Sequence, residues 1–236
     1  MQTMTNTRNS CNGQITAPPG IIDNLSAEAL QDLESMMFSY SYRSNVILFT
    51  EQEEPAQVFV VMDGAVKLSI NSSDGRRLIL RIVKKGEIVG LSSALSGTPY
   101  EMTAETLYPS KLAPIRRSDF LNFLLRHPEV YQTITRELGH ELAMACEQLR
   151  TVVLSNSAPE KLARLLLEWG EQGQTTECGT RFRFALTHGE IGEFIGTSRE
   201  TVTRTLSSFR SRKLVTFQGS TVTIPNRTAL ASFARG

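Results

Sequence analysis

The chain has few of the residues that mark several common classes of protein. It holds three cysteines, three histidines and one tryptophan among 236 residues, and its formal net charge is +1. The cysteines (Cys11, Cys146 and Cys178) are odd in number and widely spaced, which argues against a disulfide framework and predicts a reducing, cytoplasmic setting. No apolar run approaches the roughly 20 residues that span a bilayer, and residues 1–20 lack the apolar stretch of a signal peptide. We therefore expect no membrane partner.

Acidic and basic residues are divided unevenly along the chain. Residues 1–154 carry 14 Lys and Arg against 17 Asp and Glu, whereas residues 155–236 carry 11 against 7. This asymmetry favours a polyanionic partner at the C-terminal end, although a solvated basic face would have the same composition.

The first half of the chain predicts a tail followed by an antiparallel β domain. Residues 1–20 are rich in Thr, Asn and Ser and are predicted to form a flexible tail. A short helix is expected at 24–38, with Ser26 as its N-cap. Turn residues such as Asp63-Gly64 separate short apolar runs, which is typical of hairpins in a barrel or sandwich. The seven predicted strands are 46–49, 58–62, 65–70, 78–83, 88–89, 103–107 and 112–115. The β domain as a whole is expected to span 21–127.

A long helix is predicted over 128–154, with Pro128 at its first position. Apolar residues recur along it at alternating intervals of four and three, which is the a/d seam of a coiled coil. The seam residues are Leu138, Leu142, Ala145, Leu149 and Val152. Such a helix either pairs with its counterpart in a homodimer or packs on its own domain.

Residues 155–236 predict a second domain that contains a helix-turn-helix. A helix capped by Ser155 or Ser157 is expected to end at Trp169, followed by a polar loop (170–180) and a strand (182–186). Thr187 and Glu190 then form a capping-box pair at the start of a short helix. Gly196 permits a sharp turn, and Ser198 caps a second helix. Strands at 213–217 and 221–224 complete a wing.

The second helix of this motif carries polar and basic side chains where a recognition helix meets DNA. Arg can hold guanine O6 and N7 together, and Glu can accept a hydrogen bond from cytosine N4. The predicted DNA contacts are Thr197, Ser198, Arg199, Glu200, Thr203, Arg204, Ser207, Ser208 and Lys213. A packed helical corner without a DNA role is the alternative, and the arginines, the wing and the basic tail argue against it.

The segment Glu190-Ile191-Gly192, followed by Gly196 to Arg204, resembles the signature of the Crp/Fnr family of bacterial transcription regulators. The resemblance covers nearly all of residues 20–230. It implies an α+β fold with a cyclic-nucleotide-binding-like antiparallel β-roll, a long dimerisation helix (128–154) and a C-terminal winged helix-turn-helix (155–236). It also implies a homodimer on an inverted repeat of TGTGA-like half-sites in double-stranded DNA, read by Arg199, Glu200 and Arg204. The loop 172–178 corresponds in position to a surface that contacts RNA polymerase, and activation and repression stay equally open.

The sensor half departs from the family pattern at the residues that hold a cyclic nucleotide. The resemblance implies that Leu91 stands where a Glu binds the ribose, and that Glu101, or Met102 in a shifted register, stands where an Arg binds the phosphate. A carboxylate facing a phosphodiester is repulsive in a poorly solvated pocket, so cyclic AMP is disfavoured. The effector pocket implied by the resemblance consists of Gly90, Leu91, Ser92, Ser93, Tyr100, Glu101, Met102 and Thr103.

Other effectors can be weighed by counting ligands. Three distant cysteines cannot supply the four ligands of an iron–sulfur cluster. No histidine falls in 44–117, which disfavours haem in the β domain. Cys146 lies near the seam, where a buried apolar role is commoner than redox sensing. We expect no metal or cofactor, and either an unidentified small effector or none.

Two other functional classes are alternatives to DNA binding. A metal-dependent cupin enzyme needs histidines in its barrel, and the barrel has none. The sequence Gly90-Leu91-Ser92-Ser93-Ala94 only approximates a nucleophile elbow, and it lies among hairpin strands instead of in a parallel sheet. An enzyme is therefore not expected. A sensor module without a DNA role is the remaining alternative.

Overall fold

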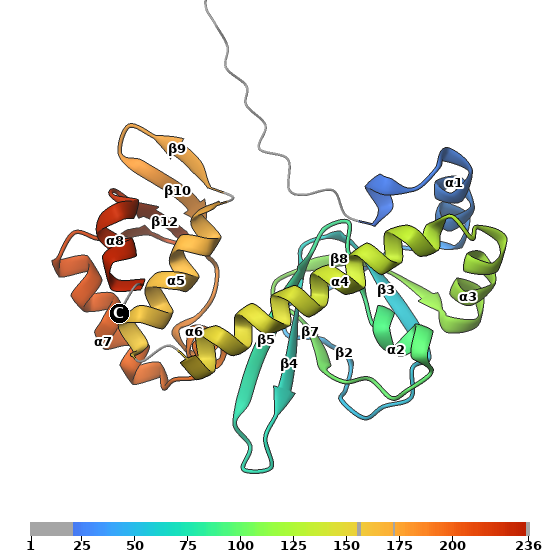
Figure 1. Ribbon diagram of the computed structural model, residues 1–236, viewed down its shortest axis with the longest axis horizontal. Helices are drawn as coiled ribbons and strands as arrows, with labels where there is room; N and C mark the ends of the chain where they lie inside the picture. Colours follow the sequence, from blue (N-terminus) through green and yellow to red (C-terminus); the bar gives the residue numbers. More distant parts are fainter. Residues whose placement is uncertain (1–20, 155–156, 172, 235–236) are drawn as a thin grey trace, which may run out of the picture.

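The structure, a computed structural model, describes residues 21–154, 157–171 and 173–234. The predicted flexible tail, with Cys11, lies outside the described residues, as does Ser155. The described chain forms a β-roll, a long helix and a C-terminal winged helix-turn-helix, so the predicted fold class is confirmed (Figure 1).

The β-roll consists of two antiparallel four-stranded sheets that face each other across an apolar core. The first has the order β1-β8-β3-β6 (Tyr40–Tyr42, Ser110–Arg116, Gln57–Asp63 and Ile88–Val89). The second has the order β2-β7-β4-β5 (Ile47–Phe49, Thr103–Thr106, Ala65–Asn71 and Arg77–Lys84). Eight strands are present where seven were predicted. The strand that the prediction missed is β1, a polar and mostly exposed edge strand without the buried alternation that marks a strand.

Short helices pack against the β1-β8-β3-β6 sheet. They are a 3₁₀ turn (Ile22–Asn24), α1 (Ala27–Met36), α2 (Leu91–Ser96) and α3 (Arg117–Arg126). The predicted N-cap of α1 is confirmed, since the Ser26 hydroxyl accepts a hydrogen bond of 3.2 Å from the Ala29 N–H. Helix α2 was not predicted. Its limits are two glycines, Gly90 and Gly97, with φ of 83° and 75°.

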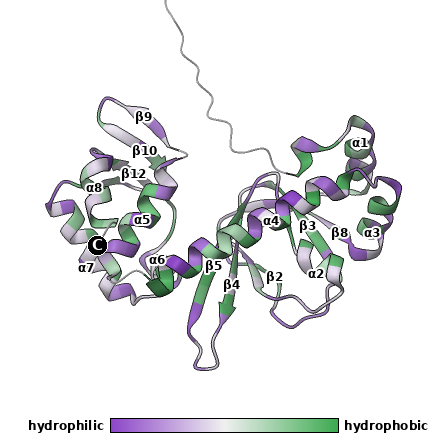
Figure 2. Ribbon diagram, in the orientation of Figure 1, coloured by the Kyte–Doolittle hydropathy of each residue, from purple (hydrophilic) through white to green (hydrophobic). Residues whose placement is uncertain are grey.

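Helix α4 (Val130–Leu149) crosses the middle of the molecule and continues as a π-helical turn, Arg150–Leu154 (Figure 1). It begins two residues after the predicted Pro128. Val130 and Ile134 are buried with Phe120 in the cluster that the helices form against the β1-β8-β3-β6 sheet. Hydrophobic and hydrophilic segments alternate along the helix (Figure 2). None of the described helices is both long and apolar enough to cross a membrane.

The C-terminal domain contains four helices and a four-stranded sheet among the described residues. The helices are α5 (Ala158–Glu171), α6 (His188–Ile195), α7 (Arg199–Ser211) and α8 (Arg227–Ala234). The sheet has the order β11-β12-β10-β9 (Thr216–Gln218, Thr221–Ile224, Gly179–Arg183 and Gln174–Thr176).

Three expectations for the loop and strands of this domain need correction, and one helix was missed. The polar loop 170–180 contains β9, which pairs with β10. Strand β10 occupies 179–183 instead of 182–186, and β11 begins at Thr216 instead of 213. Helix α8 was not predicted. Strand β9 is fully exposed, so its sequence lacks the apolar alternation on which strand prediction depends.

The cores of the two domains are continuous. Leu162 and Leu166 of α5 pack with Phe194 of α6 and Phe209 of α7, and Ile79 of the β-roll belongs to the same cluster. The helix-turn-helix therefore rests directly on the β-roll.

Two hairpin glycines offer a matched test of the β-roll. Gly64 has φ +89°, and a Cβ there would clash with the Ser110 side chain, whereas Gly75 has φ +80° and open space around it. We expect Gly75→Ala to lower the free energy of unfolding by about 1–2 kcal/mol through backbone strain alone. Gly64→Ala should lower it by about 3 kcal/mol, because overpacking adds to the strain. Chemical denaturation measures both, and equal losses would contradict the steric role of Gly64.

Candidate DNA interface and effector cavity

Helix α6 is built by the local signals that the sequence carries. The Thr187 hydroxyl accepts a hydrogen bond from the Glu190 N–H, and the Glu190 carboxylate accepts one of 2.9 Å from the Thr187 N–H, so the predicted capping box is confirmed. Ile191 and Ile195 are buried in the domain core. The helix ends at Gly196, whose φ of 65° lies in the left-handed region.

A close approach between α6 and the following turn sets the geometry of the motif. A Cβ on Gly192 would lie 2.7 Å from the Thr197 carbonyl oxygen, which is closer than a carbon and an oxygen can pack. Helix α7 starts immediately after this turn, where the Ser198 hydroxyl accepts a hydrogen bond of 3.2 Å from the Thr201 N–H. The glycine and the cap together place the N-terminus of α7 against α6.

The predicted DNA contacts all lie on α7 or beside its ends. Val202, Leu206 and Phe209 turn one face of α7 into the core. Seven of the predicted contacts are exposed: Ser198, Arg199, Glu200, Thr203, Arg204, Ser207 and Lys213. Thr197 and Ser208 are half-buried. The helix therefore presents a polar face with two arginines and a glutamate in its first two turns.

Hydrogen bonds orient several of these side chains. The Thr203 hydroxyl donates to the Arg199 carbonyl at 2.9 Å, and Arg204 Nη2 donates to Thr201 Oγ1 at 3.3 Å. Hydrogen bonds from its own backbone N–H and from Ser198, together with Arg199 and Arg204, hold the pKa of Glu200 below its ordinary value. Glu200 is therefore ionised at neutral pH and can act as an acceptor.

Two contacts around α7 were not predicted. His188 Nδ1 lies 2.8 Å from Thr203 Oγ1 and so connects the start of α6 to the exposed face of α7. The Arg210 guanidinium lies 4.6 Å from the ring centre of Phe217 in β11, a cation–π contact that ties the wing to α7. Each contact joins two different elements of the domain, so no pattern within a single helix or strand predicts it.

The predicted effector pocket forms a small cavity of about 20 Å³ in the β-roll. Seven of the eight predicted residues line it (Gly90, Leu91, Ser92, Ser93, Tyr100, Glu101 and Met102), and so do Phe49, Leu68 and Glu141. Thr103 does not line the cavity, and its hydroxyl accepts a hydrogen bond of 3.1 Å from the Glu51 N–H. A cavity of this size holds about one water molecule.

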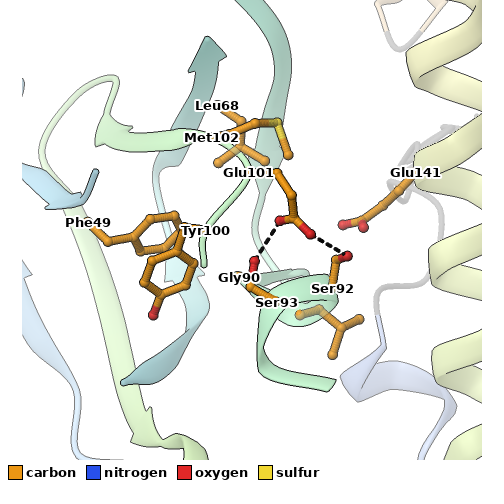
Figure 3. A pocket seen from close by; sticks show the side chains of 10 residues that line it. Phe49, Leu68, Gly90, Ser92, Ser93, Tyr100, Glu101, Met102 and Glu141 are labelled. Carbon is orange, nitrogen blue, oxygen red and sulfur yellow. Dashed lines mark hydrogen bonds between the residues drawn. The ribbon is translucent and has the colours of Figure 1, made fainter. Parts of the chain in front are cut away.

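The side chains of the cavity bind one another (Figure 3). Ser92 and Ser93 donate hydrogen bonds of 2.9 and 2.6 Å to the two carboxylate oxygens of Glu101. The Tyr100 ring stacks on Phe49 with 3.7 Å between ring centres. Its hydroxyl donates a hydrogen bond of 2.5 Å to the Gln57 carbonyl, and burial raises the pKa of this hydroxyl. The Glu101 carboxylate and the stacked rings are therefore already engaged by other groups of the β-roll.

Helix α4 contributes one wall of the cavity through Glu141. Its carboxylate lies 2.5 Å from Arg81 Nη1. Burial, only partly offset by Arg81, raises the pKa of Glu141. Among the described residues, no three His, Cys, Asp or Glu side chains are grouped so that they could hold a metal ion.

The β-roll, the long helix and the exposed recognition helix define a winged helix-turn-helix protein with a sensor-type domain, and comparisons place it among known regulators. Residues 40–127 match the cyclic nucleotide-binding domain, and residues 160–233 match the Crp-like helix-turn-helix domain. The chain belongs to the Crp/Fnr family and is a DNA-binding transcription regulator of that type.

Relatives and solved structures support this assignment over most of the chain. A "CRP-like cAMP-activated global transcriptional regulator" of Mycobacterium tuberculosis is 26% identical over 94% of this chain and 99% of its own length. The "Transcriptional activatory protein AadR" of Rhodopseudomonas palustris is 26% identical over 78% of this chain and 76% of its own. The structure of FixK2 from Bradyrhizobium japonicum aligns with a TM-score of 0.74 at 25% identity, covering 84% of this chain and 96% of FixK2. The names of the first two relatives describe transcription regulators.

Two glycines of α6 test the geometry of the helix-turn-helix. Gly192→Ala should lower the free energy of unfolding by about 1–3 kcal/mol, because the new methyl group overlaps the Thr197 carbonyl. Gly189→Ala is the matched control, since its Cβ would meet only the Thr187 hydroxyl at 3.8 Å. It should be neutral or stabilise the protein by up to about 1 kcal/mol. Thermal unfolding checks both variants, and a neutral Gly192→Ala would contradict the close approach.

Proposed function

We propose that the chain binds an inverted repeat of two TGTGA-like half-sites as a homodimer, with one α7 helix in each of two successive major grooves. The observation that carries this proposal is the exposed N-terminal half of α7 with Arg199, Glu200 and Arg204. These side chains can pair with guanine and cytosine edges. The two helices would then lie about 34–36 Å apart, one turn of DNA.

The bare apolar face of α4 supports the homodimer. Leu142 and Leu149 are 68% and 56% exposed, and they lie seven residues apart on one face. Leu138 and Ala145 are half-buried and lie between the bare face and the β-roll. Val152 instead lies close to Gly196, at the start of the turn between α6 and α7. A contiguous exposed apolar face of this kind marks a protein interface.

The cavity supports control by something other than a cyclic nucleotide, or by no small ligand. Its volume of about 20 Å³ is far below the roughly 300 Å³ of common ligand pockets. Glu101 lies where the resemblance places an arginine, so a cyclic phosphate would meet a like charge.

The turn of the β9–β10 hairpin, with Glu177 and Cys178 exposed, is the proposed contact for RNA polymerase. A regulator of bacterial promoters acts in the cytoplasm.

Fluorescence anisotropy tests this function directly. The purified chain, without added ligand, is titrated onto a duplex that carries TGTGA and its inverted copy, and onto a scrambled duplex at the same salt concentration. Selective binding to the inverted repeat supports the proposal. Equal affinity for that duplex with and without cyclic AMP supports the proposal that the cavity does not bind a cyclic nucleotide. Equal affinity for both duplexes, in the presence and absence of cyclic AMP, would refute the proposed binding to the inverted repeat.

Arg204 is the sharpest test of base reading. Arg204→Ala should weaken binding to the inverted repeat by about 1–3 kcal/mol, since a fork-shaped contact to guanine is lost, and should relax the preference at one base pair of each half-site. A panel of single-base-pair substitutions in the duplex measures this. Lys213→Ala is the comparator, because the loss of a phosphate contact weakens binding to all DNA sequences alike. A uniform loss for Arg204→Ala would make Arg204 a phosphate contact.

The dimer interface is tested by placing a charge on the bare face of α4. Leu142→Glu should produce monomers and abolish preference for the inverted repeat over a single half-site, because a carboxylate is poorly accommodated in an apolar seam. Leu125→Glu is the matched control, since Leu125 of α3 is 74% exposed and lies off the seam. Sedimentation equilibrium gives the masses. A dimeric Leu142→Glu variant would remove the seam from the proposal.

A further inference from the structure

Helix α6 of the DNA-binding domain packs on strands β4 and β5 of the β-roll. Ile191 and Phe194 of α6 share a buried cluster with Ile79 and Leu107. Hydrophobic attraction is not directional. This apolar contact therefore holds the two domains together, but it does not by itself fix the angle of α6 on the sheet.

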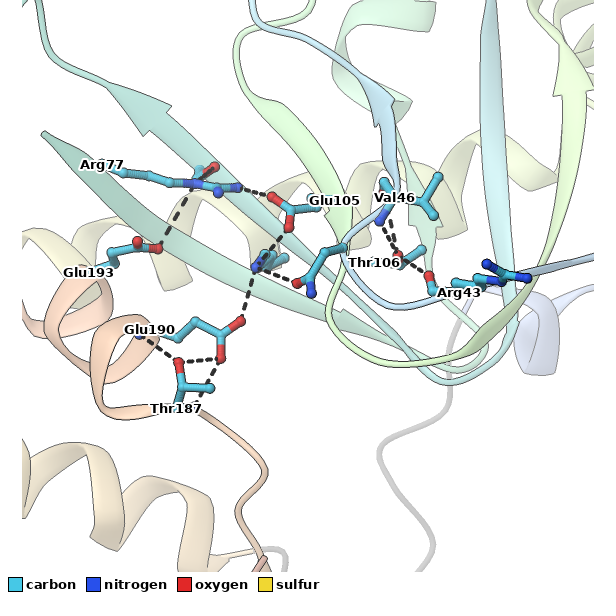
Figure 4. A network of polar contacts seen from close by, with 11 residues as sticks. Arg43, Val46, Arg77, Glu105, Thr106, Thr187, Glu190 and Glu193 are labelled. Carbon is cyan, nitrogen blue, oxygen red and sulfur yellow. Dashed lines mark hydrogen bonds and ion pairs between the residues drawn. The ribbon is translucent and has the colours of Figure 1, made fainter. Parts of the chain in front are cut away.

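Buried charges fix the first turn of α6. Lys67 of β4 has a side chain that is 4% exposed, and its Nζ lies 3.0 Å from Glu105 of β7 and 2.9 Å from Glu190 of α6 (Figure 4). Glu190 is also the carboxylate that completes the capping box with Thr187. Lys67 therefore anchors the β-roll to the N-terminal end of α6 through a directional contact.

Arg77 of β5 extends this network. Its Nη2 lies 2.6 Å from Glu105, and its Nε lies 4.0 Å from Glu193 of α6. Burial acts to raise the pKa of Glu105, but hydrogen bonds from Arg77 and Lys67 outweigh it and hold that pKa below its ordinary value. Glu105 is thus ionised at neutral pH. The five residues Lys67, Arg77, Glu105, Glu190 and Glu193 are named the junction cluster.

The last turn of α6 has a separate anchor on α4. The buried Gln148 donates hydrogen bonds from Nε2 to the Ile79 carbonyl at 3.0 Å and to the Phe194 carbonyl at 2.6 Å. The carbonyls of a final helical turn lack partners within the helix, so Gln148 satisfies one of them. Helix α6 is therefore held at both ends, by Lys67 at its first turn and by Gln148 at its last.

We propose that the junction cluster and Gln148 fix the angle of the DNA-binding domain relative to α4, and so determine which half-site spacing the dimer accepts. This inference rests on the proposed function, because spacing matters only to a dimer on an inverted repeat. One added base pair moves a half-site by about 3.4 Å along the duplex and by about 35° around it. A rigid junction cannot follow that movement. Lys67 acts as a positioning residue, distant from the bases.

Anisotropy with a series of inverted repeats, lengthened or shortened by one and two base pairs, tests the inference. The wild-type chain should prefer one spacing over those two base pairs away by at least about tenfold, because both half-sites must be reached at once. Lys67→Gln should reduce this preference to about threefold or less, while affinity for a single half-site stays within about twofold. Lys67→Arg should restore the preference. Lys111→Gln, on the exposed face of β8, is the control that leaves it unchanged.

Two further measurements separate the outcomes. An unaltered spacing profile for a folded Lys67→Gln variant overturns the inference. If that variant does not fold, Arg77→Gln takes its place, because the Arg77 side chain is 25% exposed and its loss is milder. If no variant distinguishes any inverted repeat from the scrambled duplex, the proposed function fails. Small-angle scattering then tests the junction alone: the radius of gyration should rise in Lys67→Gln, and an unchanged value overturns the inference.

Discussion

The placement of α4 depends on one buried cation. Arg81 of β5 is 9% exposed and lies within 2.8 Å of three carboxylates, those of Glu87, Glu137 and Glu141. The last two belong to α4, so the guanidinium fixes the helix against the sheet. Removing one partner of such a buried ion pair lowers the free energy of unfolding by about 3–5 kcal/mol, because the remaining charge is left buried and unpaired. With α4 held in this way, one face of the helix is committed to the β-roll and the opposite face stays bare.

Because of the helical period, α4 borders the cavity, the bare face and the DNA-binding domain at regular intervals. Residues seven apart lie on one face after two turns. Glu141 and Gln148 form such a pair, and they connect the wall of the cavity to the last turn of α6. Leu142 and Leu149 form the next pair, which faces solvent. A shift or rotation of α4 would therefore act on the cavity, the bare face and the DNA-binding domain together, which gives a physical route for coupling between sites.

The elements that the sequence predicted are those built by local chemistry. The capping box of α6, the cap of α7 and the Asp63-Gly64 turn each depend on residues within a few positions of one another. Three of the elements that it missed lack such a signal: β1 and β9 are mostly exposed, and α2 has only six residues. The Lys67–Glu190 pair joins residues 123 positions apart, and Glu141 reaches the cavity from another element. Only the folded chain brings these partners together, so the family resemblance located the cavity but not its wall on α4.

The carboxylates of the cavity restrict the chemistry of a ligand that could occupy it. Glu101 is already satisfied by two serine hydroxyls, and Glu141 is paired with Arg81. An anionic ligand would have to displace the serines from Glu101 and then face two carboxylates at low dielectric, where like charges repel strongly. A ligand that donates hydrogen bonds would replace the serines without that repulsion, but it would first need the stacked Tyr100 and Phe49 to move apart. In this arrangement, Ser92 and Ser93 tie α2 to Glu101, just before β7, and Glu141 ties α4 to Arg81 of β5. Glu141 is thus both a wall of the cavity and a partner of Arg81, so a ligand that displaced Glu141 would also disturb a contact that positions α4.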